Sequence, residues 1–283
     1  MENDNNEHYS MFAPKSAYFQ GVKKHFNKIA LIDADKLKHL VAYDVSSDLK
    51  QNRQREPDRL VYHIENRLAD IHRQFSAAGY IFCFSGKSHD TFRSSIAVIK
   101  KYKGSREIDP SFYDGKIEDM ADVVRFVRKQ YPTLLFADLE ADDVLCFLQT
   151  EDTFIFSNDK DLNQIPGNHF CTETKDLKII SEEEAFKNLW YQMIIGDSTD
   201  CIPGLPRYGP VAARKIIDEV PLKHLPGRIL HEYHTVYGMT AGTDAFVETW
   251  NLVKLRMNRG EHFKAKYQEA FTLLQLMKIN CNL

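Results

Sequence analysis

The chain has 283 residues, which is enough to bury a substantial core in one large domain or two modest ones. Its composition is typical of a soluble globular protein, and it contains neither an apolar run long enough to span a membrane nor a signal-peptide pattern. The five cysteines are scattered, with no CxxC pair, which indicates reduced thiols in a cytoplasmic protein and not a disulfide frame or a zinc site. The net charge of −3 does not exclude a nucleic-acid partner, because basic residues are concentrated locally along the chain. We expect a monomer with no membrane partner.

The first part of the chain alternates strand-like and helix-like segments. Residues 1–25 are expected to form a loosely docked lead-in, and residues 28–33 a buried strand. A polar insertion over 45–58 is expected to be a loop. It is followed by a helix over 59–79, whose apolar residues recur at helical spacing before a glycine, and by a second strand over 80–86.

The middle of the chain continues this alternation. Residues 92–119, which contain Gly104, Pro110 and Gly115, predict a mobile and partly helical connection. A helix over 120–132, a strand over 133–139, another helix and a strand over 153–157 follow, and then a hairpin over 169–181. This order predicts an α/β fold with a mostly parallel central sheet flanked by helices.

From residue 182 onward the pattern is helical. We therefore expect three parts: the lead-in, a catalytic domain over 26–190 with a short arch over about 92–120, and a helical region over 191–283.

Nine carboxylates lie in four short clusters at expected strand or helix ends. They are Asp33 and Asp35, Glu140, Asp142 and Asp143, Asp159 and Asp161, and Asp197 and Asp200. Each cluster alone could be a turn or the acidic first turn of a helix. Together they would repel one another unless a cation were bound, and the carboxyl ends of parallel strands meet at one edge of a sheet. The set predicts a shared site for hard divalent cations such as Mg²⁺.

A pair of divalent cations about 4 Å apart can activate a water and stabilise the leaving oxygen in phosphoryl displacement. This chemistry needs no side-chain nucleophile, and the chain has no Ser or Cys nucleophile motif. Hydride transfer has no support either, because no GxGxxG follows the first strand.

Two further segments carry positive charge. In the first, Gly204 and Gly209 allow close backbone approach before a helix, and Arg207, Arg214 and Lys215 add contacts to phosphates. This pattern is typical of a DNA-backbone clamp, although glycine-rich turns are common.

The second basic segment surrounds an aromatic residue that could stack on an unpaired base. Its members are Arg93, Lys100, Lys101, Tyr102, Lys103 and Arg106. Cations here could stabilise charge on a phosphate, and the alternative is an exposed basic loop.

Together these motifs resemble the 5′→3′ exonuclease and flap endonuclease family, especially its bacteriophage members. The first metal-binding aspartate of that family matches Asp33, and its ExDD and DxD motifs match 140–143 and 159–161. Its GDxxDNIPG signature matches 196–204, which contains Asp197 and Asp200. The matches run in family order over about two thirds of the chain.

The resemblance implies a PIN-like fold and two Mg²⁺ or Mn²⁺ ions, bound by all the clustered acids except Asp35. It also implies hydrolysis of DNA from 5′ ends or flaps, with Arg93 and Lys103 at the scissile phosphate. RNA–DNA hybrids are a further possible substrate. The family's helix–three-turn–helix binds K⁺ through backbone carbonyls, here near Leu205 and Tyr208.

The sequence departs from the family pattern in three places. Gly86 stands where many members have an aspartate, so either Asp90 substitutes or one ligand is lost. Cys201 replaces an asparagine, and the arch is short, which favours exonuclease over flap-specific activity. A PIN-type ribonuclease and a catalytically weakened DNA-binding protein remain alternatives. The biological role, in primer removal or in host DNA degradation, stays open.

Overall fold

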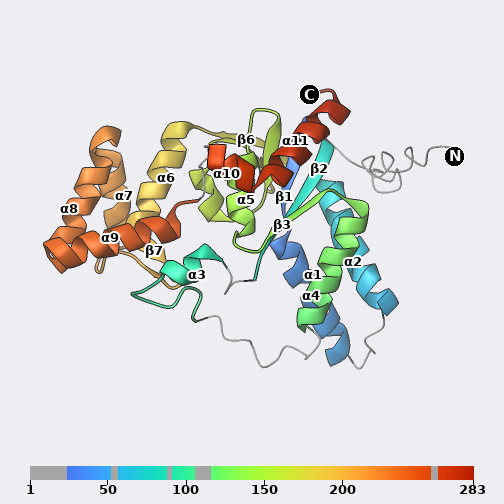
Figure 1. Ribbon diagram of the computed structural model, residues 1–283, viewed down its shortest axis with the longest axis horizontal. Helices are drawn as coiled ribbons and strands as arrows, with labels where there is room; N and C mark the ends of the chain where they lie inside the picture. The colour runs from blue at the N-terminus through green and yellow to red at the C-terminus, as the bar shows by residue number, and fades with distance from the viewer. Residues whose placement is uncertain (1–23, 52–56, 88–90, 106–115, 256–260) are drawn as a thin grey trace.

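The computed structural model describes residues 24–51, 57–87, 91–105, 116–255 and 261–283 (Figure 1). Residues 1–23 of the lead-in and the expected site residues Asp90 and Arg106 lie outside these ranges, and so does part of the expected arch. Within the described ranges, no helix is both long and apolar enough to cross a bilayer.

A six-stranded sheet forms the centre of the fold, in the order β3-β2-β1-β4-β5-β6. Its strands are β1 (His25–Asp33), β2 (Ser76–Ser85), β3 (Thr133–Phe136), β4 (Thr153–Phe156), β5 (Gly167–Cys171) and β6 (Asp176–Ile180). All neighbouring strands run parallel except β5 and β6, which form the expected hairpin. The mostly parallel α/β sheet predicted from the alternating pattern is confirmed.

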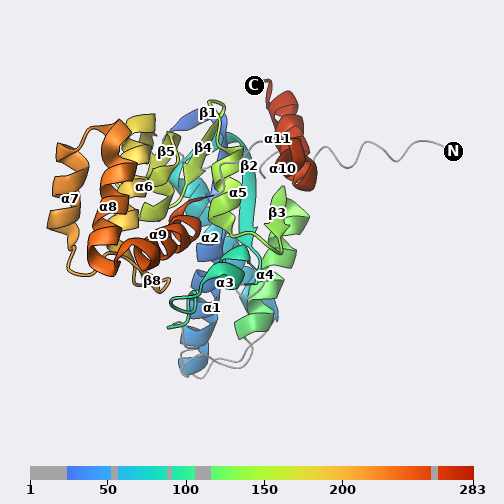
Figure 2. The same cartoon turned by 60° about the vertical axis from the view of Figure 1, so that its left-hand side comes forward.

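Helices cover both faces of the sheet, because side chains of successive strand residues point to opposite faces. Ala30 and Ile32 of β1 face one core, which is covered by α1 (Asp35–Lys50), α2 (Pro57–Gln74) and α4 (Lys116–Gln130). The opposite core is covered by α5 (Ala141–Leu148), α10 (Glu261–Lys266) and α11 (Gln268–Cys281). Figures 1 and 2 show these two groups of helices on opposite sides of the strands.

A third core lies beside the sheet, on the left of Figure 1. It is built by α6 (Glu182–Ile195), the hairpin of β7 (Gly196–Asp197) and β8 (Ile202–Pro203), α7 (Pro210–Glu219), η4 (Leu222–His224), α8 (Leu225–Tyr237) and α9 (Met239–Val253). The chain then returns to the sheet, where α10 and α11 pack. The helical region expected over 191–283 is therefore divided in space after α9.

Two expected boundaries are wrong. The polar stretch expected as a loop continues α1 as far as Lys50 and buries Val45, which is 5% exposed. Helix α2 ends at Gln74, and β2 begins at Ser76, so Gly79 lies inside a strand and not at a helix end. A Cβ at Gly79 would lie 2.4 Å from Met277 Cε, so α11 packs closely over β2 at this position, against the flexible end of a methionine side chain.

Candidate active site

Eight of the nine clustered acids line one cavity of about 420 Å³, which we call the carboxylate cavity. They are Asp33, Asp35, Glu140, Asp142, Asp159, Asp161, Asp197 and Asp200. The cavity lies where β1 and β4 end, as expected for a parallel sheet. Asp33 and Asp159, which are 126 positions apart in the sequence, converge there because β1 and β4 are adjacent in the sheet.

Short turns after the strands hold several of these carboxylates in place. Asp33 is the last residue of β1, and Ser157 Oγ, just after β4, donates a 2.8 Å hydrogen bond to its Oδ2. Asp159 caps η3 (Lys160–Gln164) by accepting the N–H of Asp161 at 2.8 Å. The acids therefore act as turn and cap residues and also line the cavity, so the turn interpretation and the metal-site interpretation of the sequence are compatible.

The β7–β8 hairpin presents the last acidic pair. Asp197 Oδ1 accepts the backbone N–H groups of Thr199 at 2.7 Å and Asp200 at 3.2 Å. Gly196 has a φ of 65°, and a Cβ on Gly204 would lie 2.3 Å from the backbone carbon of Ile195. Only glycine fits these two positions without strain, so the glycines of the motif close the hairpin.

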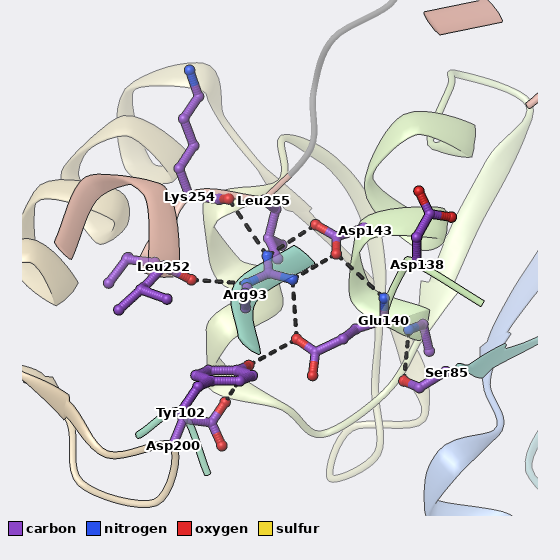
Figure 3. A network of polar contacts seen from close by, with 12 residues as sticks. Ser85, Arg93, Tyr102, Asp138, Glu140, Asp143, Asp200, Leu252, Lys254 and Leu255 are labelled. Carbon is purple, nitrogen blue, oxygen red and sulfur yellow. Dashed lines mark hydrogen bonds and ion pairs between the residues drawn. The ribbon is translucent and has the colours of Figure 1, made fainter. Parts of the chain in front are cut away.

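Arg93 lies in the protein interior and does not line the carboxylate cavity (Figure 3). Its guanidinium donates to Asp143 at 2.6 and 2.9 Å, to Glu140 at 3.0 Å and to the carbonyl oxygen of Leu252 at 2.9 Å. The side chain is 2% exposed, and that of Asp143 is fully buried. This placement does not fit the expected contact of Arg93 with a phosphate or of Asp143 with a metal ion, because the two groups neutralise each other.

Tyr102 and Lys103 approach the same acids from the segment after α3 (Phe92–Ile96). The hydroxyl of Tyr102 lies 2.8 Å from Glu140 and 2.9 Å from Asp200, and its ring is buried, so it does not fit the expected stacking on a base. Lys103 forms an ion pair with Glu140 and lines the carboxylate cavity, with a φ of 53°. Lys103 is therefore a cation placed among the carboxylates.

The carboxylates perturb one another's ionisation. Burial and the neighbouring Asp35 charge raise the pKa of Asp33 to about 6, and burial with Asp159 raises that of Asp161 to about 7. Burial, together with the charges of Asp33 and Asp159, raises the pKa of Asp142 well above its usual value. Burial would also raise the pKa of Glu140, but Lys103 and Arg93 keep it below its usual value.

The donor set fits a hard divalent cation in its chemistry. Among the described residues, no three His, Cys, Asp or Glu side chains are arranged to hold one ion in common. Mg²⁺ does not require such a cage, because it keeps several waters and is usually bound by one or two carboxylates together with substrate phosphates. The raised pKa values of Asp33 and Asp161 show negative charge that a bound cation would relieve.

Asp35 is the site residue that sequence reasoning placed outside the ligand set. Its Oδ1 accepts the N–H of Ser85 at the end of β2, at 3.0 Å, and it lines the carboxylate cavity. It thus brings a carboxylate to the strand end where Gly86 has none. The alternation of Asp33 and Asp35 around a buried Ala34 was the signal that could have found it.

The expected DNA-backbone clamp has the predicted local structure. Helix α7 begins at Pro210, directly after Gly209, whose Cβ position is open. Arg207 and Lys215 are exposed, and the guanidinium of Arg214 lies 4.5 Å from the centroid of the Tyr191 ring.

The structure also describes the expected K⁺ site and two further residues expected to contact DNA. Leu205 is buried and its carbonyl accepts the N–H of Tyr208 at 3.2 Å, next to the β7–β8 hairpin. Lys100 and Lys101 are exposed after α3.

The fold and the site together define an α/β protein with an acidic cavity at the carboxyl ends of parallel strands. Residues 28–190, more than half of the chain, match the sequence model of the N-terminal resolvase-like domain of 5′-3′ exonucleases, so the chain belongs to the 5′-3′ exonuclease family.

Two curated proteins are similar over shorter stretches. A 5′-3′ exonuclease of Buchnera aphidicola subsp. Acyrthosiphon pisum is 26% identical over 60% of this chain and 63% of its own length. A DNA polymerase I of Rhizobium leguminosarum is 28% identical over 49% of this chain and 14% of its own. The chain thus spans less than two thirds of either relative.

Solved structures share the fold over nearly the whole chain. The zinc-bound T5 5′-exonuclease has a TM-score of 0.61 and 16% identity, covering 90% of this chain and 99% of that one. The bacteriophage T5 flap endonuclease in complex with DNA and metal ions has a TM-score of 0.56 and 15% identity, with the same coverage. These likenesses support the PIN-like fold.

Proposed function

We propose that the chain is a divalent-metal-dependent 5′→3′ exonuclease and flap endonuclease that hydrolyses DNA phosphodiester bonds from 5′ ends. The observation that carries this proposal is the carboxylate cavity itself, because eight acids from four separate segments line it together with Lys103 and Lys160. Two divalent cations, when bound there, supply activation of a water and neutralisation of charge on the leaving oxygen.

The protein's own residues would bind the cations and the phosphate. Asp33 ends β1, Asp142 lies in the first turn of α5, Asp159 lies just after β4, and all three line the cavity. Lys103 and Lys160 add positive charge beside them, so a phosphate could be stabilised between cation and ammonium groups. Arg93 would act through Glu140 and Asp143 as a positioning residue.

Further proposals follow from the resemblance of the sequence to the 5′→3′ exonuclease and flap endonuclease family. We propose Mg²⁺ as the working cation with Mn²⁺ as a substitute, and a K⁺ ion at the backbone near Leu205 and Tyr208. The exposed Lys100, Lys101, Arg207, Arg214 and Lys215 would contact the DNA backbone without reading its sequence. RNA–DNA hybrid as a second substrate, a monomeric state and a cytoplasmic location are further proposals.

A direct assay tests the function. A 5′-labelled duplex, a 5′ flap and a single-stranded RNA are each incubated with Mg²⁺ or with EDTA. We expect nucleotides to be released from the DNA substrates only with Mg²⁺, and cleavage confined to the RNA would instead indicate a ribonuclease. DNA binding without turnover, even with Mn²⁺, would contradict the proposal.

A variant pair locates the activity in the carboxylate cavity. Asp159→Ala should abolish cleavage and leave DNA binding largely intact, whereas Glu173→Ala, an exposed acid in the β5–β6 turn, should cleave like the wild type. If Asp159→Ala cleaves at the wild-type rate, the carboxylate cavity is not the active site.

A further inference from the structure

A second cavity, of about 250 Å³, opens beside the carboxylate cavity, and we call it the side cavity. It lies between α1, α2 and the ends of β4 and β5. The two cavities share Asp33, Lys36, Ser157 and Asn158 as lining residues. The two cavities therefore adjoin one another at Asp33.

Four apolar side chains line the interior of the side cavity. Leu37 and Leu40 come from α1, Ile71 comes from α2, and Phe156 closes the cavity from the end of β4. The Phe156 ring is held in place by Phe75, whose ring centroid lies 5.2 Å away. Apolar walls that include a fixed aromatic ring suit a flat ring system.

The rim of the side cavity is polar. Gln74, Asn158 and Thr172 provide amide and hydroxyl groups that can both donate and accept hydrogen bonds. Thr172 already donates to Asn158 at 3.0 Å, so the rim is partly ordered. A few polar groups around an apolar interior are typical of small-molecule sites, where they fix the orientation of the ligand.

Positive charge lies at the junction of the two cavities. Lys36 is exposed, lines both cavities, and forms no ion pair with any residue in the described ranges. By contrast, Arg67, which also lines the side cavity, is held by Asp44 through hydrogen bonds of 2.6 and 2.7 Å and lies 3.8 Å from Asp70, the second acid of the lining. Lys36 is therefore the cation of the side cavity that can bind an incoming anion.

We propose that the side cavity binds the nucleobase of a nucleotide whose 5′-phosphate lies at the carboxylate cavity, with Lys36 contacting that phosphate. The inference rests on the proposed function only in placing a nucleic-acid phosphate at the carboxylates. The volume is just below the roughly 300 Å³ of the smallest typical ligand sites, so the cavity accepts one base and no longer segment. Because the rim groups can both donate and accept, the site is expected to take purines and pyrimidines alike.

The first test measures binding without cleavage. Equilibrium binding of deoxyadenosine 5′-monophosphate is compared with that of deoxyribose 5-phosphate, which lacks the base, in Mg²⁺. The wild type should bind the nucleotide about tenfold more tightly, as expected when one base stacks on an aromatic ring. Equal affinity for the two probes would overturn the proposal.

Two tryptophan variants on one helix localise the effect. Leu40→Trp fills the side cavity and should remove the preference for the nucleotide while leaving deoxyribose 5-phosphate binding unchanged. Tyr43→Trp is the matched control, because Tyr43 is 64% exposed on α1 and does not line the cavity. A Leu40→Trp protein that still prefers the nucleotide would show that the base binds elsewhere.

A cleavage experiment separates this inference from the proposed function. A 5′-phosphorylated duplex with an intact 5′-terminal nucleotide is compared with the same duplex carrying an abasic 5′ terminus. The wild type should show a KM about tenfold lower for the intact end, and Leu40→Trp should make the two equal. Cleavage of both ends with one KM would reject the side cavity as a base site. Cleavage of neither would reject the proposed function, and the nucleotide-binding comparison would still decide the inference.

Discussion

The guanidinium of Arg93 and the carboxylate of Asp143 form two hydrogen bonds, of 2.6 and 2.9 Å, with neither side chain more than 2% exposed (Figure 3). The pair joins α3 to α5. A third bond, from Arg93 to the carbonyl oxygen of Leu252, reaches the end of α9. The buried Arg93–Asp143 ion pair thus links α5, which packs on the sheet, to the end of α9 in the helical region. It lies beside the carboxylate cavity, because Arg93 also bonds to Glu140, which lines that cavity.

Removing one member of the Arg93–Asp143 ion pair should destabilise the fold. Arg93→Met leaves Asp143 buried without its cation, which typically costs about 3–5 kcal/mol of unfolding free energy. Urea denaturation should show this loss, and the double variant Arg93→Met with Asp143→Leu should recover much of it, because an apolar pair does not need charge compensation.

The control for this prediction is an exposed arginine. Arg125 pairs with Asp122 one helical turn away on α4, and Arg125→Met should change stability by no more than about 0.5 kcal/mol. If Arg93→Met is equally mild but raises the KM for DNA, then Arg93 contacts substrate, as the sequence first indicated.

Tyr102→Phe distinguishes a positioning role from base stacking. The substitution keeps the ring and removes the hydroxyl that lies between Glu140 and Asp200. We expect kcat to fall by about 10- to 100-fold, as is common when a residue that orients metal ligands is lost, with an unchanged Kd for DNA. Fluorescence anisotropy with labelled DNA gives the Kd. An unchanged kcat would instead favour a role for the ring alone.

Most residues of the carboxylate cavity could be found from the sequence, because the order of parallel strands determines where the strand ends meet. Asp33 and Asp159 each follow an apolar strand, and parallel strands end at one edge of a sheet, so their convergence could be predicted without side-chain detail. The partners of Arg93 and Tyr102 could not be predicted in this way. Whether a basic or aromatic residue faces solvent or the core depends on how α9 packs against α3, and that packing has no local sequence signal.

Metal binding and pH should be linked through the carboxylates. The pKa values of Asp33 and Asp161 are raised to about 6 and about 7, so the folded protein holds protons that the unfolded chain has released. Metal-free stability should therefore be highest near pH 4, as far as these two groups are concerned, and fall as pH rises toward 7. Bound Ca²⁺ should offset this, adding about 2.7 kcal/mol at a hundredfold excess over Kd.

Thermal denaturation at several pH values with EDTA or Ca²⁺ tests this linkage. Asp161→Asn should stabilise the metal-free protein near pH 7 and flatten the decline between pH 5 and about pH 7. Glu173→Gln, an exposed control, should leave the profile unchanged. A wild-type protein whose metal-free stability rises over this range would contradict the assignment of raised pKa values.

The basic groups near α7 should show the signature of phosphate contacts. Arg207→Ala and Lys215→Ala should each weaken DNA binding equally for all sequences and reduce the slope of log K against log salt by about one. Lys187→Ala on α6, whose ammonium pairs with Glu183 at 2.6 Å, is the control. Unchanged slopes for both variants would place the DNA elsewhere.

Gly86 is the position where the sequence left a question, since a carboxylate is expected there by family resemblance. A Cβ at Gly86 would lie 2.3 Å from the carbonyl oxygen of Ala137 and 2.6 Å from that of Phe136, which are backbone atoms and cannot rotate away. An aspartate therefore cannot be added without moving the end of β2 or β3. Asp35, bonded to the N–H of Ser85, supplies a carboxylate at that strand end by a different route.

This geometry predicts that adding a methyl group lowers the stability of the protein at Gly86 but hardly changes it at Gly209. Gly86→Ala should lower the free energy of unfolding by about 1–3 kcal/mol, the usual cost of overpacking. Gly209→Ala, whose added Cβ would meet nothing within 4 Å, should change the free energy of unfolding by no more than about 0.5 kcal/mol.

The same position tests which residue supplies the carboxylate at the end of β2. Gly86→Asp should be destabilised like Gly86→Ala and gain no cleavage activity. Asp35→Asn should lose activity about 10- to 100-fold with its stability retained. A Gly86→Asp protein that is stable and more active would show that the strand end can accept the carboxylate and that Asp35 does not take its place.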